Sequence, residues 1–168
     1  DYVPYKLTMA AVQRQTGYPQ VERQLYREVL DLEPGNADAH LALIGAMLAE
    51  GQTGPAETQL AAALNAAPTN ERIVRFAVEY WLDRGRGKQA LEVLDRVARS
   101  PNPPIGLRET VADLYVRVGR PDEAERILRQ LGPGEASGAG VRQKAVLAKL
   151  AIARGRISEG RRAFEELV

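Results

Sequence analysis

The sequence contains no cysteine and only one histidine, which removes several classes of functional site. Disulfides, thiolate zinc sites and thiol catalysis are excluded, and a single imidazole is too few for the usual zinc centre. Aromatic residues make up 5% of the chain, whereas hydrophobic residues make up 45%, with Ala and Leu prominent. This composition favours closely packed helices over a β-sandwich, which needs more Val, Ile, Thr and aromatic residues.

Long apolar runs and a strong net charge are also missing. No run approaches the roughly 18 apolar residues that indicate a membrane-spanning helix. The formal net charge of +1 gives no overall attraction to nucleic acid or to anionic lipid. The serines at 100, 137 and 158 lie in predicted turns or loops, and none is in a nucleophile-elbow context. We therefore expect no catalytic residues, no cofactor, no metal, no nucleic-acid partner and no membrane insertion.

Glycine, by contrast, recurs at a nearly fixed interval. Five glycines, separated by steps of 34, 34, 34 and 36 residues, are Gly17, Gly51, Gly85, Gly119 and Gly155. A constant period in this range is typical of solenoids built from two-helix units. With the glycine at position 15, the units are residues 3–36, 37–70, 71–104, 105–140 and the incomplete 141–168. The two-residue insertion falls in the glycine-rich stretch 132–140, where we expect a looser connection.

Each unit shows the pattern helix, glycine turn, helix. Glycine adopts the left-handed conformation that closes a helix. Asn36 and Asn70 stand where they cap the next first helix, and Pro34 and Pro68 end the second helices. Positions 20, 24 and 27 are spaced four and three apart, so they form one apolar face of the second helix. The single histidine, His40, and the aromatic residues at position 11, Trp81 and Tyr115, are expected to have packing roles.

At these columns the chain resembles the tetratricopeptide repeat family. Besides the period, the resemblance rests on Ala56, Ala90, Ala124, Tyr26, Phe164, Tyr115, Pro34 and Pro68. Positions 4 and 8 depart from the family pattern, so the units are degenerate. The resemblance implies an all-α fold, a right-handed superhelical solenoid of antiparallel helix pairs. We expect residues 1–168 to form a single solenoid segment of a longer array, because the fifth unit stops at Val168 without a polar capping helix.

The resemblance also implies a binding groove on the concave face of the solenoid. In the family this groove is lined by positions 2, 5, 9, 12 and 13 of the first helices. The partner-binding residues expected here are Leu41, Leu48, Arg72, Arg75, Glu79, Asp83, Asp113, Arg117 and Lys149. Apolar groups beside charged groups suit an extended segment or an amphipathic helix of a partner. Equally, Arg75 and Glu79 have the spacing of an ordinary i,i+4 ion pair on a solvated helix.

The resulting functional prediction is a non-catalytic scaffold that binds a protein or peptide. An alternative is a structural spacer, because the Ala-, Arg- and Leu-rich units resemble in style the repeat proteins of bacterial cell-envelope and exopolysaccharide-export systems. This resemblance favours the periplasm or cell envelope without excluding the cytoplasm. An RNA-binding helical repeat ranks lower, since residues 37–70 contain no Lys or Arg and interrupt any basic stripe. The sequence leaves the partner and the oligomeric state open.

Overall fold

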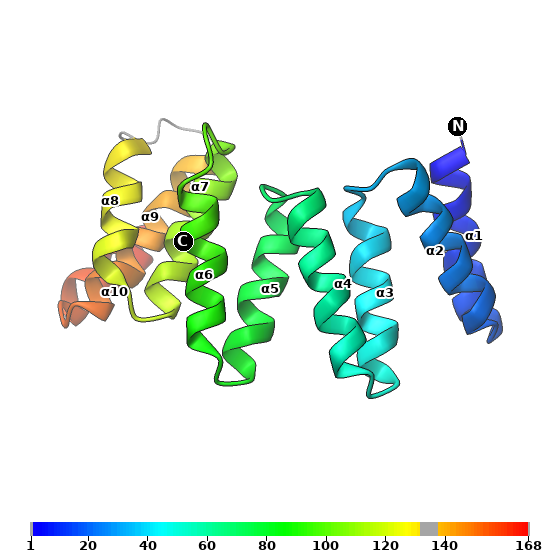
Figure 1. Ribbon diagram of the computed structural model, residues 1–168. Helices are drawn as coiled ribbons and strands as arrows, with labels where there is room; N and C mark the ends of the chain where they lie inside the picture. Colours follow the sequence, from blue (N-terminus) through cyan, green and yellow to red (C-terminus); the bar gives the residue numbers. More distant parts are fainter. Residues whose placement is uncertain (1, 132–137, 168) are drawn as a thin grey trace. The chain divides into compact units, whose positions relative to one another are not determined.

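A computed structural model of the chain describes residues 2–131 and 138–167, and every regular element in those ranges is an α-helix (Figure 1). The helices alternate between the first and second helix of a repeat. The first helices are α1 (Tyr2–Thr16), α3 (Ala37–Ala49), α5 (Glu71–Asp83), α7 (Ile105–Arg117) and α9 (Gly138–Ala153). The second helices are α2 (Pro19–Leu32), α4 (Thr53–Ala66), α6 (Gly87–Ala98), α8 (Pro121–Leu131) and α10 (Ile157–Glu165). The expected helix–turn–helix units are therefore present.

The turn inside each repeat has the same backbone structure at all five glycines. Their φ angles lie between +68° and +81°, in the left-handed region. In the second repeat the Gly51 N–H donates to the Leu48 carbonyl at 3.0 Å, and the Gln52 N–H donates to the Met47 carbonyl at 2.8 Å. This pair of bonds is the Schellman motif, which satisfies the last carbonyls of a helix. The predicted role of the recurring glycine is confirmed.

The other predicted helix boundaries are also confirmed. The Asn36 Oδ1 accepts a hydrogen bond from the Ala39 N–H at 3.0 Å, which caps α3. The Asn70 Oδ1 accepts from the Ile73 N–H at 3.3 Å in the first turn of α5. Pro34 and Pro68 follow the last residues of α2 and α4 by two positions. Each boundary depends on groups that are close in sequence.

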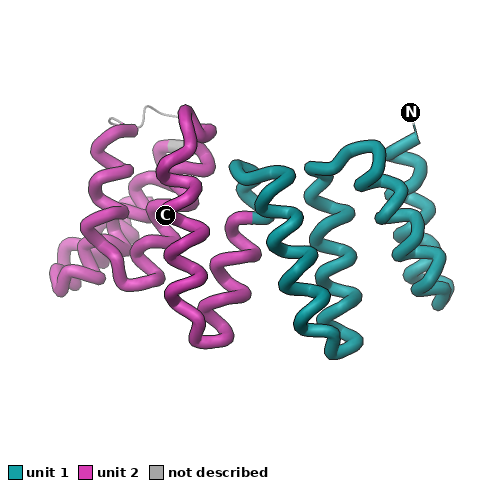
Figure 2. The backbone as a smooth tube through the Cα atoms, viewed as in Figure 1, with its two compact units in different colours: residues 1–73 teal, residues 74–168 magenta. Residues whose placement is uncertain are grey.

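The chain divides into two compact units, residues 1–73 and residues 74–168 (Figure 2). We call them the N-terminal unit and the C-terminal unit and describe each by itself. The division falls within α5, so Arg72 belongs to the first unit and Arg75 to the second. A single continuous solenoid segment over residues 1–168 stays a prediction.

The N-terminal unit has its main core between α1, α2 and α3. The buried residues of this core are Ala10, Tyr26, Val29, Ala39 and Leu43. Glu22 is also buried, at the repeat position that Ala56 occupies in the second repeat. Its carboxylate lies 3.0 Å from Arg14 Nε, and Arg14 also donates to the Tyr26 hydroxyl at 2.9 Å. An ion pair thus replaces the small side chain in the first repeat.

In the C-terminal unit the predicted apolar face of the second helices is buried. Ala90, Leu94 and Val97 form this face on α6, and Ala124 and Leu128 form it on α8. Leu147, at position 7 of the last repeat, is by contrast 44% exposed.

The predicted connection at 132–140 falls largely outside the described residues. Residues 138–140, however, belong to the first turn of α9 and not to a loop.

Candidate binding grooves

Within residues 2–131 and 138–167, no group of three or more His, Asp or Glu side chains is placed to hold a metal ion. The His40 ring is buried, and its Nε2 lies 2.8 Å from the Pro34 carbonyl oxygen while its Nδ1 lies 2.9 Å from Gln59 Nε2. The network assigns the proton to Nε2, so Nδ1 accepts from the amide. Both ring nitrogens of His40 are hydrogen-bonded within the fold, and the buried ring agrees with the predicted packing role.

No helix in the described ranges combines the length and apolar character that crossing a bilayer requires.

The N-terminal unit contains a groove with a cavity of about 430 Å³. It is lined by Leu7, Arg14, Tyr26, Asp38, Leu41, Ala42 and Arg72. Leu7 and Leu41 are half-buried and come from equivalent positions of α1 and α3. Beside them, Arg72 donates to the Asp38 carboxylate at 2.6 Å. We call this set of lining residues the N-terminal groove; it places an apolar surface next to an exposed ion pair.

The C-terminal unit contains a second groove with a cavity of about 270 Å³. Its lining residues come from α5, α7 and α9 and are Arg75, Glu109, Thr110, Asp113, Arg142, Ala145, Val146 and Lys149. Arg75 donates to the Thr110 hydroxyl at 3.2 Å, and the Lys149 ammonium lies 2.5 Å from the Asp113 carboxylate. This set, the C-terminal groove, brings both signs of charge together around small and apolar side chains.

Ion pairs connect first helices of successive repeats within each unit. They are Asp38–Arg72 in the N-terminal unit, and Glu79–Arg117 and Asp113–Lys149 in the C-terminal unit. The Glu79 and Arg117 side chains are 40% and 44% exposed, at an N–O distance of 2.7 Å. Exposed pairs of this kind contribute about 0–1 kcal/mol each. The predicted groove charges therefore reach towards the neighbouring repeat at small energetic gain.

The structure brings together most of the binding residues predicted from sequence. Leu41 and Arg72 line the N-terminal groove. In the C-terminal unit, Arg75, Asp113 and Lys149 line one cavity, and Glu79 pairs with Arg117. The lining of neither cavity includes Leu48, which is half-buried, or Asp83, which is exposed. Binding by any of these residues stays a prediction.

Four lining residues lie outside the groove positions predicted from the sequence: Tyr26, Ala42, Thr110 and Val146. Thr110 and Val146 stand at position 6, directly after the predicted groove position 5. Neighbouring helix residues differ by about 100° around the axis, so a wide groove includes both. Tyr26 belongs to a second helix, and its hydrogen bond from Arg14 brings its hydroxyl to the groove.

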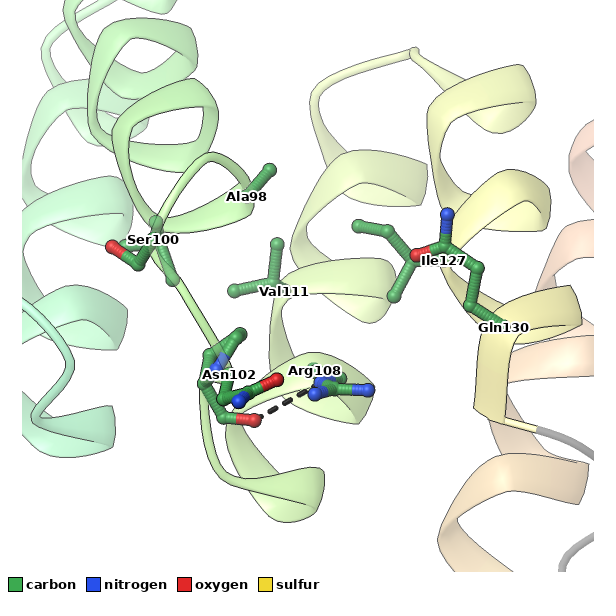
Figure 3. Close-up of a pocket in the computed structure, with 9 residues that line it drawn as sticks. Ala98, Ser100, Asn102, Arg108, Val111, Ile127 and Gln130 are labelled. Atoms are coloured by element: carbon green, nitrogen blue, oxygen red, sulfur yellow. Dashed lines mark hydrogen bonds between the residues drawn. The ribbon is translucent and has the colours of Figure 1, made fainter.

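A smaller hollow of about 210 Å³ lies where α6, α7 and α8 meet (Figure 3). Its lining residues are Val97, Ala98, Ser100, Asn102, Pro103, Arg108, Val111, Ile127 and Gln130. Arg108 Nε donates to the Pro103 carbonyl at 3.0 Å, the dashed line in Figure 3. Asn102 has a φ of +48°, which turns the chain between α6 and α7. The lining includes no carboxylate or histidine, so this hollow offers no acid–base pair.

Comparison with known proteins agrees with this architecture. Residues 23–78 match the family model described as tetratricopeptide repeat. A tetratricopeptide repeat protein from Parabacteroides merdae superposes with a TM-score of 0.63 at 18% identity, covering 99% of this chain and 65% of that one. A putative kinesin light chain from Podosopora anserina, with nearly identical TPR-like repeats, gives 0.62 at 17% identity, covering 98% and 92%. PilF of Pseudomonas aeruginosa gives 0.57 at 16% identity, covering 98% and 74%.

No curated protein sequence matches the chain. The structural identities are low, so these neighbours establish the fold and not a shared role.

The described residues thus have the all-α tetratricopeptide repeat fold, and residues 23–78 also carry the family's sequence pattern. The fold class and the family resemblance predicted from the sequence are confirmed. Tetratricopeptide folds generally serve as protein-interaction scaffolds and are generally non-catalytic.

Proposed function

We propose that the chain is a non-catalytic scaffold that binds a protein partner through two grooves, each of which takes a segment of that partner. The observation that supports this proposal is the pair of cavities, one in each unit, which are lined mostly by positions 2, 5, 6 and 9 of first helices. Cavities of about 430 and 270 Å³ are large enough for individual side chains of a bound segment. Main-chain groups of an extended or helical segment would lie along the groove, with side chains entering the cavities.

The two grooves fit different side chains of such a segment. Leu7 and Leu41 provide an apolar surface in the N-terminal groove, where a Leu-, Met- or Val-like side chain is accommodated. Glu109, Asp113 and Lys149 make the C-terminal groove polar, so it suits polar or charged side chains. Because the exposed ion pairs are individually weak, a partner's charges can exchange with them at low cost.

The proposal is tested by placing a photo-crosslinking amino acid at Leu41 or at Lys149 in the native source. Ala62, which is exposed on α4 and outside both cavities, is the matched control position. We expect both groove positions to capture one discrete partner and Ala62 to capture none.

The captured partner is then titrated, as a purified protein, with the variant Leu41→Asp/Arg72→Ala/Arg75→Ala. Loss of one apolar anchor and two charged contacts is expected to weaken binding at least tenfold, or roughly 1.4 kcal/mol. Circular dichroism should show unchanged helical content. Equal affinity of the partner for the variant and the parent chain would show that the partner does not bind in the grooves.

A structural spacer in a bacterial envelope assembly is the second candidate. The ion pairs between successive first helices favour it, because they join repeats without any ligand. A spacer tolerates groove substitutions but not enlargement of the buried small residues Ala56, Ala90 and Ala124. Replacing each of these by Leu should cost about 1–3 kcal/mol by overpacking. Assembly that survives the groove variant but fails with these three would support the spacer.

A further inference from the structure

A third cavity, of about 540 Å³, lies among α8, α9 and α10 in the C-terminal unit. Its lining residues are Glu125, Leu128, Arg129, Gln143, Leu147, Leu150, Ala151, Arg156 and Glu159. Its surface combines apolar side chains with charged ones, and among the charged residues Arg129 pairs with Glu125 and Arg156 pairs with Glu159. The size falls in the range of about 300–1,000 Å³ that is usual for ligand clefts.

The repeat register of the chain shows which side chains stand at the equivalent place in the two preceding repeats. Ala151 stands at position 11, which Trp81 and Tyr115 occupy in the two preceding repeats. The equivalence is structural, because in each of these repeats the backbone carbonyl of the position-11 residue accepts the hydrogen bond that spans five residues in the Schellman motif. The Tyr115 carbonyl accepts from the Arg120 N–H at 2.8 Å, and the Ala151 carbonyl accepts from the Arg156 N–H at 2.9 Å.

In the fourth repeat the aromatic side chain packs towards the preceding second helix. Tyr115 is 1% exposed, and its hydroxyl donates to the Asp95 carboxylate on α6 at 2.7 Å. Burial raises the pKa of Tyr115, and the bond to Asp95 raises it further. Position 11 is therefore a place where a phenol ring is enclosed by two successive repeats.

In the fifth repeat the same place is lined but not filled. Ala151 provides only a methyl group, and the preceding second helix, α8, provides Leu128 and Arg129. Arg129 stands at position 25, the position of Asp95 in the repeat before. Leu147 is left 44% exposed beside this space. The Arg129 guanidinium, a hydrogen-bond donor, thus stands where the fourth repeat has the Asp95 carboxylate, which accepts from the Tyr115 hydroxyl.

We propose that this cavity binds a tyrosine side chain of a partner protein. The ring packs against Leu128, Leu147 and Ala151, and the phenol oxygen accepts a hydrogen bond from the Arg129 guanidinium. Arg129 is 76% exposed and carries five N–H donors, so its pair with Glu125 leaves donors for a ligand. The same chemistry occurs within the chain, where Arg14 donates to the Tyr26 hydroxyl at 2.9 Å.

This site uses a different side of α9 from the C-terminal groove. The groove takes Arg142, Ala145 and Lys149, whereas the cavity takes Leu147 and Ala151. Helix residues two apart differ by about 200° around the axis, which separates the two faces. The proposed tyrosine site shares no lining residue with the C-terminal groove, so it can be tested independently of binding in the grooves.

The test titrates the isotope-labelled chain with N-acetyl-tyrosinamide and follows backbone amide shifts. We expect saturable shifts at residues 128–129 and 147–151, with tyrosinamide binding more tightly than the phenylalanine and leucine analogues. Ala151→Tyr fills the cavity with the chain's own ring and should abolish these shifts while raising the melting temperature. Arg129→Met should lower tyrosinamide affinity roughly tenfold, to that of the phenylalanine analogue. Ala62→Ser, at an exposed position of α4 outside the cavities described above, is the matched control and should leave the titration unchanged.

Equal shifts in the parent and in Ala151→Tyr would overturn the proposal, as would shifts that do not saturate. Equal affinity for the leucine and tyrosine analogues would show a general apolar hollow and would also overturn it. If Ala151→Tyr fails to fold, as judged by circular dichroism, Ala151→Leu fills part of the same cavity and is read in the same way.

Discussion

Gly160 stands at the same repeat position as Ala56, Ala90 and Ala124, yet alanine does not fit there. A Cβ at Gly160 would lie 2.7 Å from the Ala148 carbonyl oxygen and 2.5 Å from Ile152 Cγ1. The first of these atoms belongs to the backbone and cannot rotate away. Helix α10 therefore approaches α9 more closely than an alanine would allow.

Two glycine-to-alanine substitutions should consequently have opposite effects. Gly160→Ala gains helix propensity but forces the backbones apart, so we expect a net loss of about 1–2 kcal/mol in unfolding free energy. Gly45→Ala lies within α3, where an added Cβ meets nothing within 4 Å. It should raise the unfolding free energy by about 0.5–1 kcal/mol. Urea denaturation of the two variants checks both signs, and stabilisation by Gly160→Ala would contradict the close approach.

Single residues were only partly predictable from the sequence. The column of small residues at position 20 indicated a tight helix contact, and Ala56, Ala90 and Ala124 are buried there. The same column contains Glu22, and nothing in the local sequence shows that Arg14 neutralises it from α1. The partner of a buried charge depends on how two helices face each other, which local patterns do not contain.

At the scale of helices, the Tyr115–Asp95 hydrogen bond connects α7 to α6 across a repeat junction. The acceptor is a carboxylate, so the bond should contribute about 1.5–3 kcal/mol. Burial, followed by this bond, raises the pKa of Tyr115 above its ordinary value of about 10. The junction is therefore sensitive to alkaline pH.

The pH dependence of Tyr115→Phe tests this link. Above about pH 10 the unfolded chain releases the phenol proton while the folded chain retains it, so folding stability from Tyr115 falls as pH rises. At pH 8 we expect Tyr115→Phe to be the less stable protein. By pH 11 the difference should shrink at up to about 1.4 kcal/mol per pH unit, because phenylalanine does not ionise. A difference that is constant from pH 8 to pH 11, measured by urea unfolding, would mean that the phenol titrates equally in both states.

Helix boundaries were predicted well because their determinants are local. Asn36 caps a backbone group three residues away, and Gly51 closes α3 through bonds that span at most five residues. Side-chain partners between helices were predicted less well. The i,i+4 spacing indicated a pair between Arg75 and Glu79, and the structure pairs Glu79 with Arg117, 38 residues along the chain.

At the scale of the whole molecule, stability is a sum of repeats and of the contacts between neighbouring repeats. The exposed ion pairs on the first helices belong to those contacts, and their energies are small. This makes them better suited to exchange with a partner's charges than to hold the solenoid together.

A double-mutant cycle on Glu79→Gln and Arg117→Gln measures one such contact. We expect a coupling free energy of about 0.2–1 kcal/mol at low salt, because both side chains are well exposed. In 1 M NaCl the Debye length falls to about 3 Å, and the coupling should approach zero. In the cycle on Asp113→Asn and Lys149→Gln, Asp113 is only 19% exposed, so the coupling should be equal or larger. A coupling above about 2 kcal/mol would show that the pairs hold the repeats together and are not readily exchanged.

The candidate grooves were predictable in outline from the repeat register. Leu41, Arg72, Arg75, Asp113 and Lys149 were chosen by position alone and line the two cavities. The cavity beside Ala151 was not predicted, although its signal was present in the sequence as an alanine in the column of Trp81 and Tyr115. A missing side chain is visible as a cavity only once the helices around it are placed.

The five glycine turns also bear on how the chain acquires its structure. Each turn is closed by hydrogen bonds between residues no more than five apart, so the entropy of closing it is small. Proteins dominated by such short-range contacts fold quickly and have low contact order. A helix pair whose turn needs no distant residue is able to form as soon as it leaves the ribosome. Synthesis from the N-terminus would thus add one helix pair after another, each covering the apolar face that the preceding pair leaves exposed.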